Sequence, residues 1–140
     1  MAIRASAALR NAALNGDSIA ALIDGDSGNG TIEFFTSTVH ATFGNPPGGT
    51  KIATVTLASP SFQDSASGSM TANTIQSDVS ADASGDIGCF VLKDSSGNIC
   101  LDGSVTTIAA GTGDVQFASV TATAADTIAM TSLIVSIPQT

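Results

Sequence analysis

The spacing of hydrophobic and polar positions changes once along the chain, near residue 24. Before that point the stretch IRASAALRNAALNGDSIAALID is rich in alanine and leucine at helical spacing, and Ser6 is suited to the N-cap. Asn15–Gly16 interrupts the pattern, and Asp17 or Ser18 can cap a second helical piece. The pattern predicts one kinked helix or two short helices, and Gly25 can supply the left-handed residue that ends them.

After residue 30 the spacing becomes that of β-strands, with Thr, Val and Ile enriched and turn signals recurring about every ten residues. A first strand is predicted over Thr31–Thr38, and Lys51–Ala58 alternates with a period of two. Further strands are predicted in MTANTIQ, DIGCFVLKD, NICLDGSV, DVQFASVTATA and TIAMTSLIVSIP.

About eight strands behind a leading helix predict a mainly β fold, an antiparallel, jelly-roll-like β-sandwich with an N-terminal α-helical segment. A parallel βαβ fold or a helical bundle would need helices between the strands, and the pattern predicts none there. We therefore divide the single domain into a helical arm, residues 1–24, and a β-sandwich, residues 30–140.

The turn sequence DSSGN, Asp94–Asn98, predicts a hairpin whose first pair is formed by the two end residues of the turn. In that register Cys100 lies opposite Leu92. Cys89 lies opposite Gly103, so the two cysteines are not cross-strand partners. We expect two separate buried thiols, which agree with assembly in a reducing cytoplasm.

Composition and charge exclude several classes of function. The 140 residues are 43% hydrophobic and 11% charged, which is unlike a disordered chain and is enough for one domain. Four basic residues against twelve acidic ones give a net charge of −8, so nucleic acid and anionic membrane surfaces are not expected partners. No stretch approaches the roughly 18 apolar residues of a membrane span.

The acidic stretch DGDSGNGTIE has part of the ligand pattern of a calcium loop. Counted from Asp24, an EF-hand loop would need ligands at positions 1, 3, 5 and 12. Asp24 and Asp26 fit, but Gly28 and Phe35 occupy positions 5 and 12. An irregular site could use Asp24, Asp26 and Glu33. We favour a helix end followed by a strand start, and predict no metal.

Catalytic chemistry has few candidates in this sequence. The one histidine, His40, would have to serve any Ser-His-Asp or Cys-His arrangement, and it lies beside a proline-glycine loop without a G-x-S-x-G elbow. The loop GNPPGGTK lacks the G-K-[ST] order of a phosphate-binding loop. The chain has neither Trp nor Tyr to stack a sugar ring. We predict a protein that is not an enzyme and has no cofactor.

The N-terminal segment is the candidate contact region. It is alanine-rich, which permits close approach, and its arginines can pair with carboxylates on a partner. The candidate partner-contact residues are Ile3, Arg4, Arg10 and Leu14. An alternative is that the same segment covers one end of its own sandwich, and the sequence leaves both open.

The succession MAIRASAALRNAALN, GTIEFFTST, GGTKIATVTLASPSFQDSASGSMTANTI, KDSSGNICLDGSV and TSLIVSIP resembles a widespread family of small tailed-phage proteins over nearly the whole chain. These motifs are structural and not catalytic. The matching positions are Arg10, Asn11, Ile32, Pro60, Phe62, Asp94, Gly97, Asp102, Gly103 and Ser104.

The resemblance implies a virion component, a capsid decoration (cement) protein that binds the major capsid protein lattice and stabilises the head. It further implies a homotrimer on the capsid surface, assembled in the host cytoplasm. One alternative is a β-sandwich associated with the tail, neck or a fibre, with glycan binding as its function. A second alternative is a calcium-dependent hydrolase.

Overall fold

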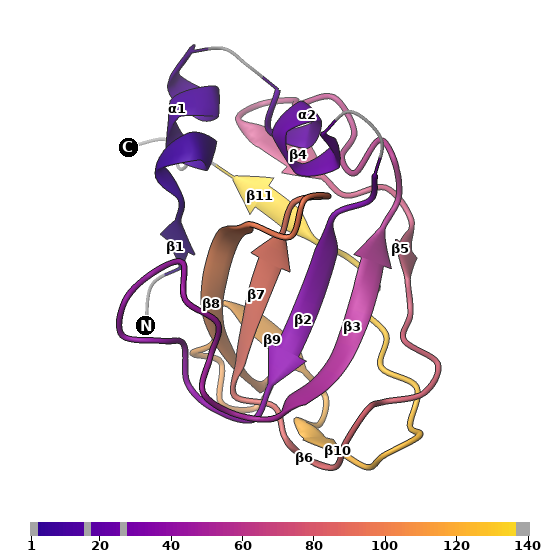
Figure 1. The fold of residues 1–140 in the computed structure, drawn as a ribbon. Coiled ribbons are helices and arrows are strands. Elements are labelled where there is room, and N and C mark those ends of the chain that lie inside the picture. The colour runs from indigo at the N-terminus through magenta and orange to yellow at the C-terminus, as the bar shows by residue number, and fades with distance from the viewer. Residues whose placement is uncertain (1–2, 16–17, 26–27, 137–140) are drawn as a thin grey trace.

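The computed structural model describes residues 3–15, 18–25 and 28–136 (Figure 1). The described chain has two helices, α1 (Ala7–Asn15) and α2 (Ile19–Asp24). Its strands are β1 (Arg4–Ala5), β2 (Thr31–Phe35), β3 (Lys51–Leu57), β4 (Ser69–Thr71), β5 (Ile75–Gln76), β6 (Gly85–Asp86), β7 (Cys89–Lys93), β8 (Ile99–Thr107), β9 (Val115–Phe117), β10 (Thr121–Ala122) and β11 (Ile134–Ser136). The predicted fold class, mainly β with an antiparallel sheet and an N-terminal helical segment, is confirmed.

The main sheet has the order β1-β8-β7-β2-β3-β5, in which all neighbours are antiparallel. Strand β9 joins β8 in parallel, a pairing that the sequence pattern did not predict. The chain doubles back after β8, and Gly113 passes so close to Thr106 that a Cβ would lie 2.7 Å from the Thr106 backbone nitrogen. This crossing therefore depends on a residue without a side chain.

The hydrophobic core lies against one face of the main sheet. Figure 1 shows β9 and the β4–β11 pair behind this sheet, with the helices at one end and the β6–β10 pair at the other. Ile32, Val55 and Leu92 of the main sheet are fully buried in this core. The rings of Phe34 and Phe117 meet edge to face at 5.3 Å and join β2 to β9.

The opposite face of the main sheet carries a smaller hydrophobic cluster. Phe35, Cys89 and Val91 pack there with Val39, which belongs to the loop after β2. That loop begins earlier than expected, because β2 ends at Phe35 whereas a strand was predicted to Thr38. The loop therefore covers part of a sheet face that would otherwise expose these apolar side chains.

The N-terminal segment is built into the same fold. Strand β1 pairs with β8, and Leu9 and Ile23 belong to the main core. The predicted caps are confirmed: the Leu9 N–H donates to Ser6 Oγ at 3.0 Å, and the Ala21 N–H donates to Ser18 Oγ at 3.2 Å. The segment thus forms two short helices that cover one end of the protein's own sheet.

Other details of those helix ends also follow the sequence. Gly25 has φ +58° at the end of α2 and donates its N–H to the Ala21 carbonyl at 2.9 Å. Asp17, the alternative N-cap, lies outside the described residues.

The predicted register of the β7–β8 hairpin is wrong by one residue. The turn itself forms as expected, with the Asp94 N–H donating to the Asn98 carbonyl at 3.0 Å. Lys93 then faces Ile99 but Leu92 faces Leu101, so Cys100 is an extra residue in β8. This bulge moves Cys89 opposite Ser104 and not Gly103.

The predicted last strand, Thr127–Pro138, is mostly irregular over residues 127–136, and its last two residues lie outside the described ones. Within the described part only Ile134–Ser136 forms a strand, β11, which pairs with β4. Ile128 makes an isolated bridge with Asp78 instead. The alternation seen in the sequence therefore describes side chains that pack on the core and not a continuous ladder.

Candidate interaction surface

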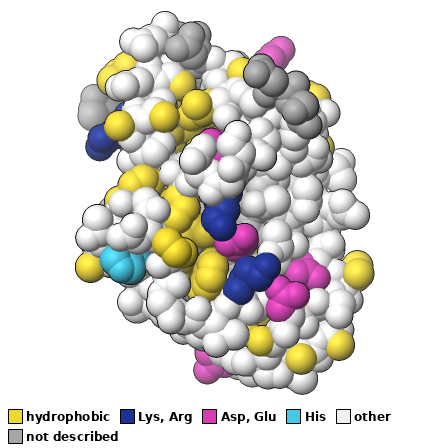
Figure 2. All heavy atoms as spheres, in the orientation of Figure 1, with side chains coloured by type: hydrophobic (Ala, Val, Ile, Leu, Met, Phe, Trp, Pro, Cys, Tyr) yellow, Lys and Arg dark blue, Asp and Glu magenta, His cyan; other side chains and the backbone are white. Residues whose placement is uncertain are grey.

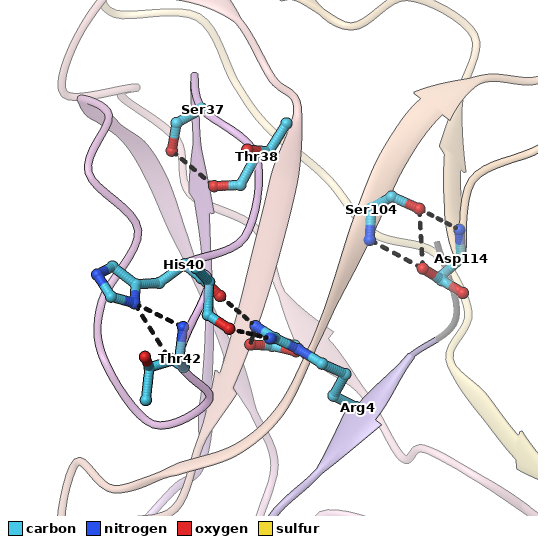
Figure 3. A network of polar contacts seen from close by, with 9 residues as sticks. Arg4, Ser37, Thr38, His40, Thr42, Ser104 and Asp114 are labelled. Atoms are coloured by element: carbon cyan, nitrogen blue, oxygen red, sulfur yellow. Dashed lines mark hydrogen bonds and ion pairs between the residues drawn. The ribbon is translucent and has the colours of Figure 1, made fainter.

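Arg4, one of the predicted partner contacts, is held inside the chain (Figure 3). Its Nε and Nη2 donate to the two carboxylate oxygens of Asp102, at 2.8 and 2.6 Å, and Asp102 is 1% exposed. The Nη2 and Nη1 groups also donate to the carbonyls of His40 and Ala41, at 2.7 and 3.2 Å. The hydrogen bond to Asp102 raises the pKa of Arg4. The guanidinium therefore fastens β1, β8 and the loop after β2 together, and its charge is satisfied within the chain.

Among the described residues, the His40 ring forms no hydrogen bond with a serine or cysteine side chain. The Nδ1 atom of its ring contacts the Thr42 N–H at 3.0 Å and the Thr42 carbonyl at 3.1 Å. Ser104, in a separate part of Figure 3, donates its hydroxyl to Asp114 at 2.8 Å and its N–H to the same oxygen at 2.9 Å. A serine nucleophile needs a base that takes its proton, and this pair instead fixes the chain between β8 and β9.

Of the residues considered for calcium, Asp24 and Glu33 have different partners within the chain. Asp24 is 9% exposed, and its two oxygens accept the Ser61 N–H at 3.2 and 2.9 Å. Glu33 pairs with Lys93 at 2.7 Å, and Asp26 lies outside the described residues. In the three described ranges, no group of three or more His, Cys, Asp or Glu residues is placed to hold a metal. Asp24 fastens α2 to the chain near Ser61.

Both cysteines are free, buried thiols, as expected. Burial raises the pKa of Cys89 to about 11, and the nearby Asp102 carboxylate acts in the same direction. Burial also raises the pKa of Cys100 to about 11, with Asp94 adding to the shift. Since the thiolate is the reactive form, neither cysteine is suited to nucleophilic chemistry at neutral pH.

Charged side chains on the visible face of the main sheet are paired. In Figure 2 the basic side chains over the middle of the sheet lie next to Asp and Glu side chains, beside a band of hydrophobic ones, whereas a basic side chain at the left edge of the view has no acidic side chain beside it. Lys93 pairs with Glu33 at 2.7 Å, and Lys51 pairs with Asp82 at 3.2 Å. The Lys51–Asp82 pair is exposed and contributes little to stability, whereas the Lys93–Glu33 pair is half-buried. Together they leave few basic groups on this face for a partner.

Exposed apolar side chains gather at one edge of the molecule. Ile3, Ile108 and Ile134 are 50%, 62% and 58% exposed. Ile3 and Ile134 line a hollow of about 240 Å³, and Ile108 and Ile134 line a second one of about 490 Å³. The two hollows share lining residues, among them Val115 and Leu133, so they lie next to each other. We call this region the β9 edge surface.

Of the three isoleucines, only Ile3 was a predicted contact. Ile108 directly precedes the turn sequence AAGTGD, where a large apolar residue has no core to fill. That position was a usable signal in the sequence. Ile134 gave none, because its exposure depends on where β11 lies.

A second surface lies at the helical end. Leu9 and Ala12 of α1 are buried, whereas Arg10 is exposed and Leu14 is 84% exposed. Beside α1 an open hollow of about 570 Å³ is lined by both polar and apolar side chains. These include Ala13, Ile19, Phe62, Asp64, Met70 and Val135. We call it the helical-end hollow.

None of the described helices is long and apolar enough to cross a membrane. No family model, no curated protein and no solved structure matches this chain. The resemblance to small tailed-phage proteins therefore stays a prediction from the sequence motifs.

Proposed function

We propose that this protein is a phage capsid decoration protein that binds the major capsid protein lattice and stabilises the head. The observation that carries the proposal is the β9 edge surface, where three exposed isoleucines border two adjacent hollows of mixed polar and apolar lining on a small, lightly charged β domain. Monomeric soluble proteins rarely expose large contiguous apolar patches, and such patches are typical of protein contacts. Burying one against a lattice stabilises the assembly by about 25 cal/mol per Å² of apolar area.

Other features support a structural and non-enzymatic role. The acidic surface, with a net charge of −8, keeps the free protein soluble before it docks through apolar contacts. The free thiols agree with assembly in the host cytoplasm. The proposal includes a homotrimer at the capsid surface, as the family resemblance implies.

The first test is the amount of the protein in purified virions. A decoration protein is expected in hundreds of copies on the head, and heads that lack it should lose resistance to heat and low salt. Quantitative mass spectrometry and electron microscopy of the particle measure both. A handful of copies at one vertex or on the tail would favour the alternative, a tail, neck or fibre protein.

The second test asks whether the β9 edge surface makes the contact. Ile134→Asp should abolish binding to heads that lack the protein, because it places a charge in the buried part of the contact. Val79→Asp is the matched control, since Val79 is 76% exposed and lines neither hollow of this surface. Equal binding by both variants would show that the β9 edge surface does not contact the head. The copy number in virions would then decide the function.

A further inference from the structure

Most charged side chains of the described residues form an ion pair or a hydrogen bond within the chain. Arg4, Lys51 and Lys93 each form an ion pair, and Arg10 forms none among the described residues. The described acids, with one exception, each accept a hydrogen bond or an ion pair. They are Asp24, Glu33, Asp78, Asp82, Asp86, Asp94, Asp102, Asp114 and Asp126. The exception is Asp64, which is exposed.

Arg10 and Asp64 lie at the same end of the molecule. Asp64 lines the helical-end hollow together with Ala13 of α1. Arg10 is on α1 itself, four residues before Leu14, so the two side chains share the outer face of the helix. One end of the fold thus carries an exposed apolar side chain beside a base, and a hollow with an acid at its lining, and neither charge is paired among the described residues.

We propose that these two features bind each other between copies of this chain. Leu14 of one copy enters the helical-end hollow of a neighbour, where Met70 and Val135 supply apolar contacts. Arg10 then pairs with Asp64 of the partner subunit. A hollow of about 570 Å³ accommodates more than one side chain, so Leu14 can be buried together with its neighbours on α1.

The complementarity of charge identifies a second copy as the occupant. Copies with a net charge of −8 repel one another, so random association is disfavoured. A contact between Arg10, the one described base without an ion pair, and Asp64, the one described acid that accepts neither an ion pair nor a hydrogen bond in the described chain, offsets part of that repulsion. It also fixes the orientation of the two copies. The outer face of α1 and the hollow are different surfaces, so the contact is head-to-tail, and it forms a ring where the rotation between copies closes. The inference concerns contact between copies, and it does not require the proposed binding to a capsid.

The experiment measures the association of the purified full-length chain by sedimentation velocity, up to roughly 100 μM protein. Arg10→Glu and Asp64→Arg should each weaken association by about tenfold or more, because each places like charges in contact. Leu14→Ser should weaken it as well, through the loss of apolar burial. Ile134→Asp, designed to abolish lattice binding, should leave association between copies unchanged.

Mixing distinguishes direct contact from damage to the fold. When the Arg10→Glu and Asp64→Arg proteins are combined, the contact between unlike copies regains opposite charges, so pairwise association should return. A ring with an odd number of copies still contains one like-charge contact. The Arg10→Glu, Asp64→Arg double variant should associate by itself for the same reason. A wild-type chain that stays monomeric overturns the proposal. Association that all three single variants retain, or that neither mixing nor the double variant restores, overturns it too.

Discussion

Two arginines six residues apart in the N-terminal segment have opposite environments. Arg4 is 27% exposed and satisfied by Asp102 and two carbonyls, whereas Arg10 lies on the outer face of α1 without an ion pair among the described residues. Both were grouped as candidate contacts because residue type and neighbouring sequence are alike. The difference shows that one segment has a base that is part of the fold and a helix face that is available to a partner.

The largest expected effect is the loss of the Arg4 interaction. Arg4→Ala leaves Asp102 buried without its partner, and should lower the free energy of unfolding by about 3 kcal/mol. Arg10→Ala should change it by less than about 0.5 kcal/mol in the dissociated protein. Urea unfolding at low protein concentration measures both. Equal losses of unfolding free energy for the two variants would contradict the conclusion that Arg4 is part of the fold and Arg10 is not.

A double variant separates the charge from the packing of the same site. Replacing both partners, with Arg4→Met and Asp102→Leu, removes the buried charge together with its counterion, and should recover part of the stability that Arg4→Ala loses. If the double variant is no more stable than Arg4→Ala, the hydrogen bonds to the loop carbonyls are the more important contribution.

The two leucines of α1 extend the comparison to apolar side chains. Leu9 is 5% exposed and Leu14 is 84% exposed. Leu9→Ala should lower the free energy of unfolding by about 2 to 3 kcal/mol, through lost burial and a cavity. Leu14→Ala should leave the dissociated protein as stable as wild type and weaken association only. Thermal unfolding with sedimentation on the same samples gives both quantities, and a stability loss for Leu14→Ala would place that side chain in the core.

The buried thiols give the free energy of unfolding a pH dependence, with Cys100 in the main core and Cys89 in the smaller cluster on the other sheet face. Burial raises the pKa of both cysteines from 9.0 to about 11, so the unfolded chain loses its thiol protons first as pH rises. Stability is therefore full below pH 9 and falls between pH 9 and 11. At pH 10 the loss is about 1 kcal/mol per thiol relative to pH 8.

Denaturant unfolding across this pH range measures the effect of the thiols. A chain with Cys89→Ala and Cys100→Ala serves as the control, because it has no thiol to titrate and should lose most of the dependence. An identical decline in that chain would assign the dependence to other groups.

The smallest expected effect concerns two aspartates near the helical end. Asp24→Asn weakens the charge-assisted hydrogen bonds from Ser61, and should lower the free energy of unfolding by about 1 kcal/mol. Asp64→Asn should not change it, because Asp64 accepts no hydrogen bond in the described chain. Urea midpoints at pH 7 compare the two variants. A larger loss for Asp64→Asn would show that this carboxylate supports the fold and is not free for a partner.

Local features of the fold were the most predictable from sequence. Ser6 and Ser18 cap their helices because a side-chain oxygen near its own backbone satisfies a free N–H, and that requires only a few consecutive residues. Gly25 and the turn from Asp94 to Asn98 follow from similarly local geometry. Features that depend on one short stretch of chain can be read from that stretch.

Features that depend on contacts far apart in the chain were not predictable. The extra residue at Cys100 shifts the β7–β8 register, and the parallel addition of β9 depends on a close crossing at Gly113. The β9 edge surface exists because Ile3 and Ile134 come together there from opposite ends of the chain. No local pattern records such proximity.

The sequence by itself determined the mainly β class, the helical N-terminal segment, the acidic character and the two separate thiols, since composition and periodicity fix these. Tertiary structure decided which of the four candidate contact residues are available to a partner. Arg4 is held inward because Asp102 of β8 lies opposite it across the β1–β8 pair. Ile3, Arg10 and Leu14 stay exposed because no described segment of the chain folds over them.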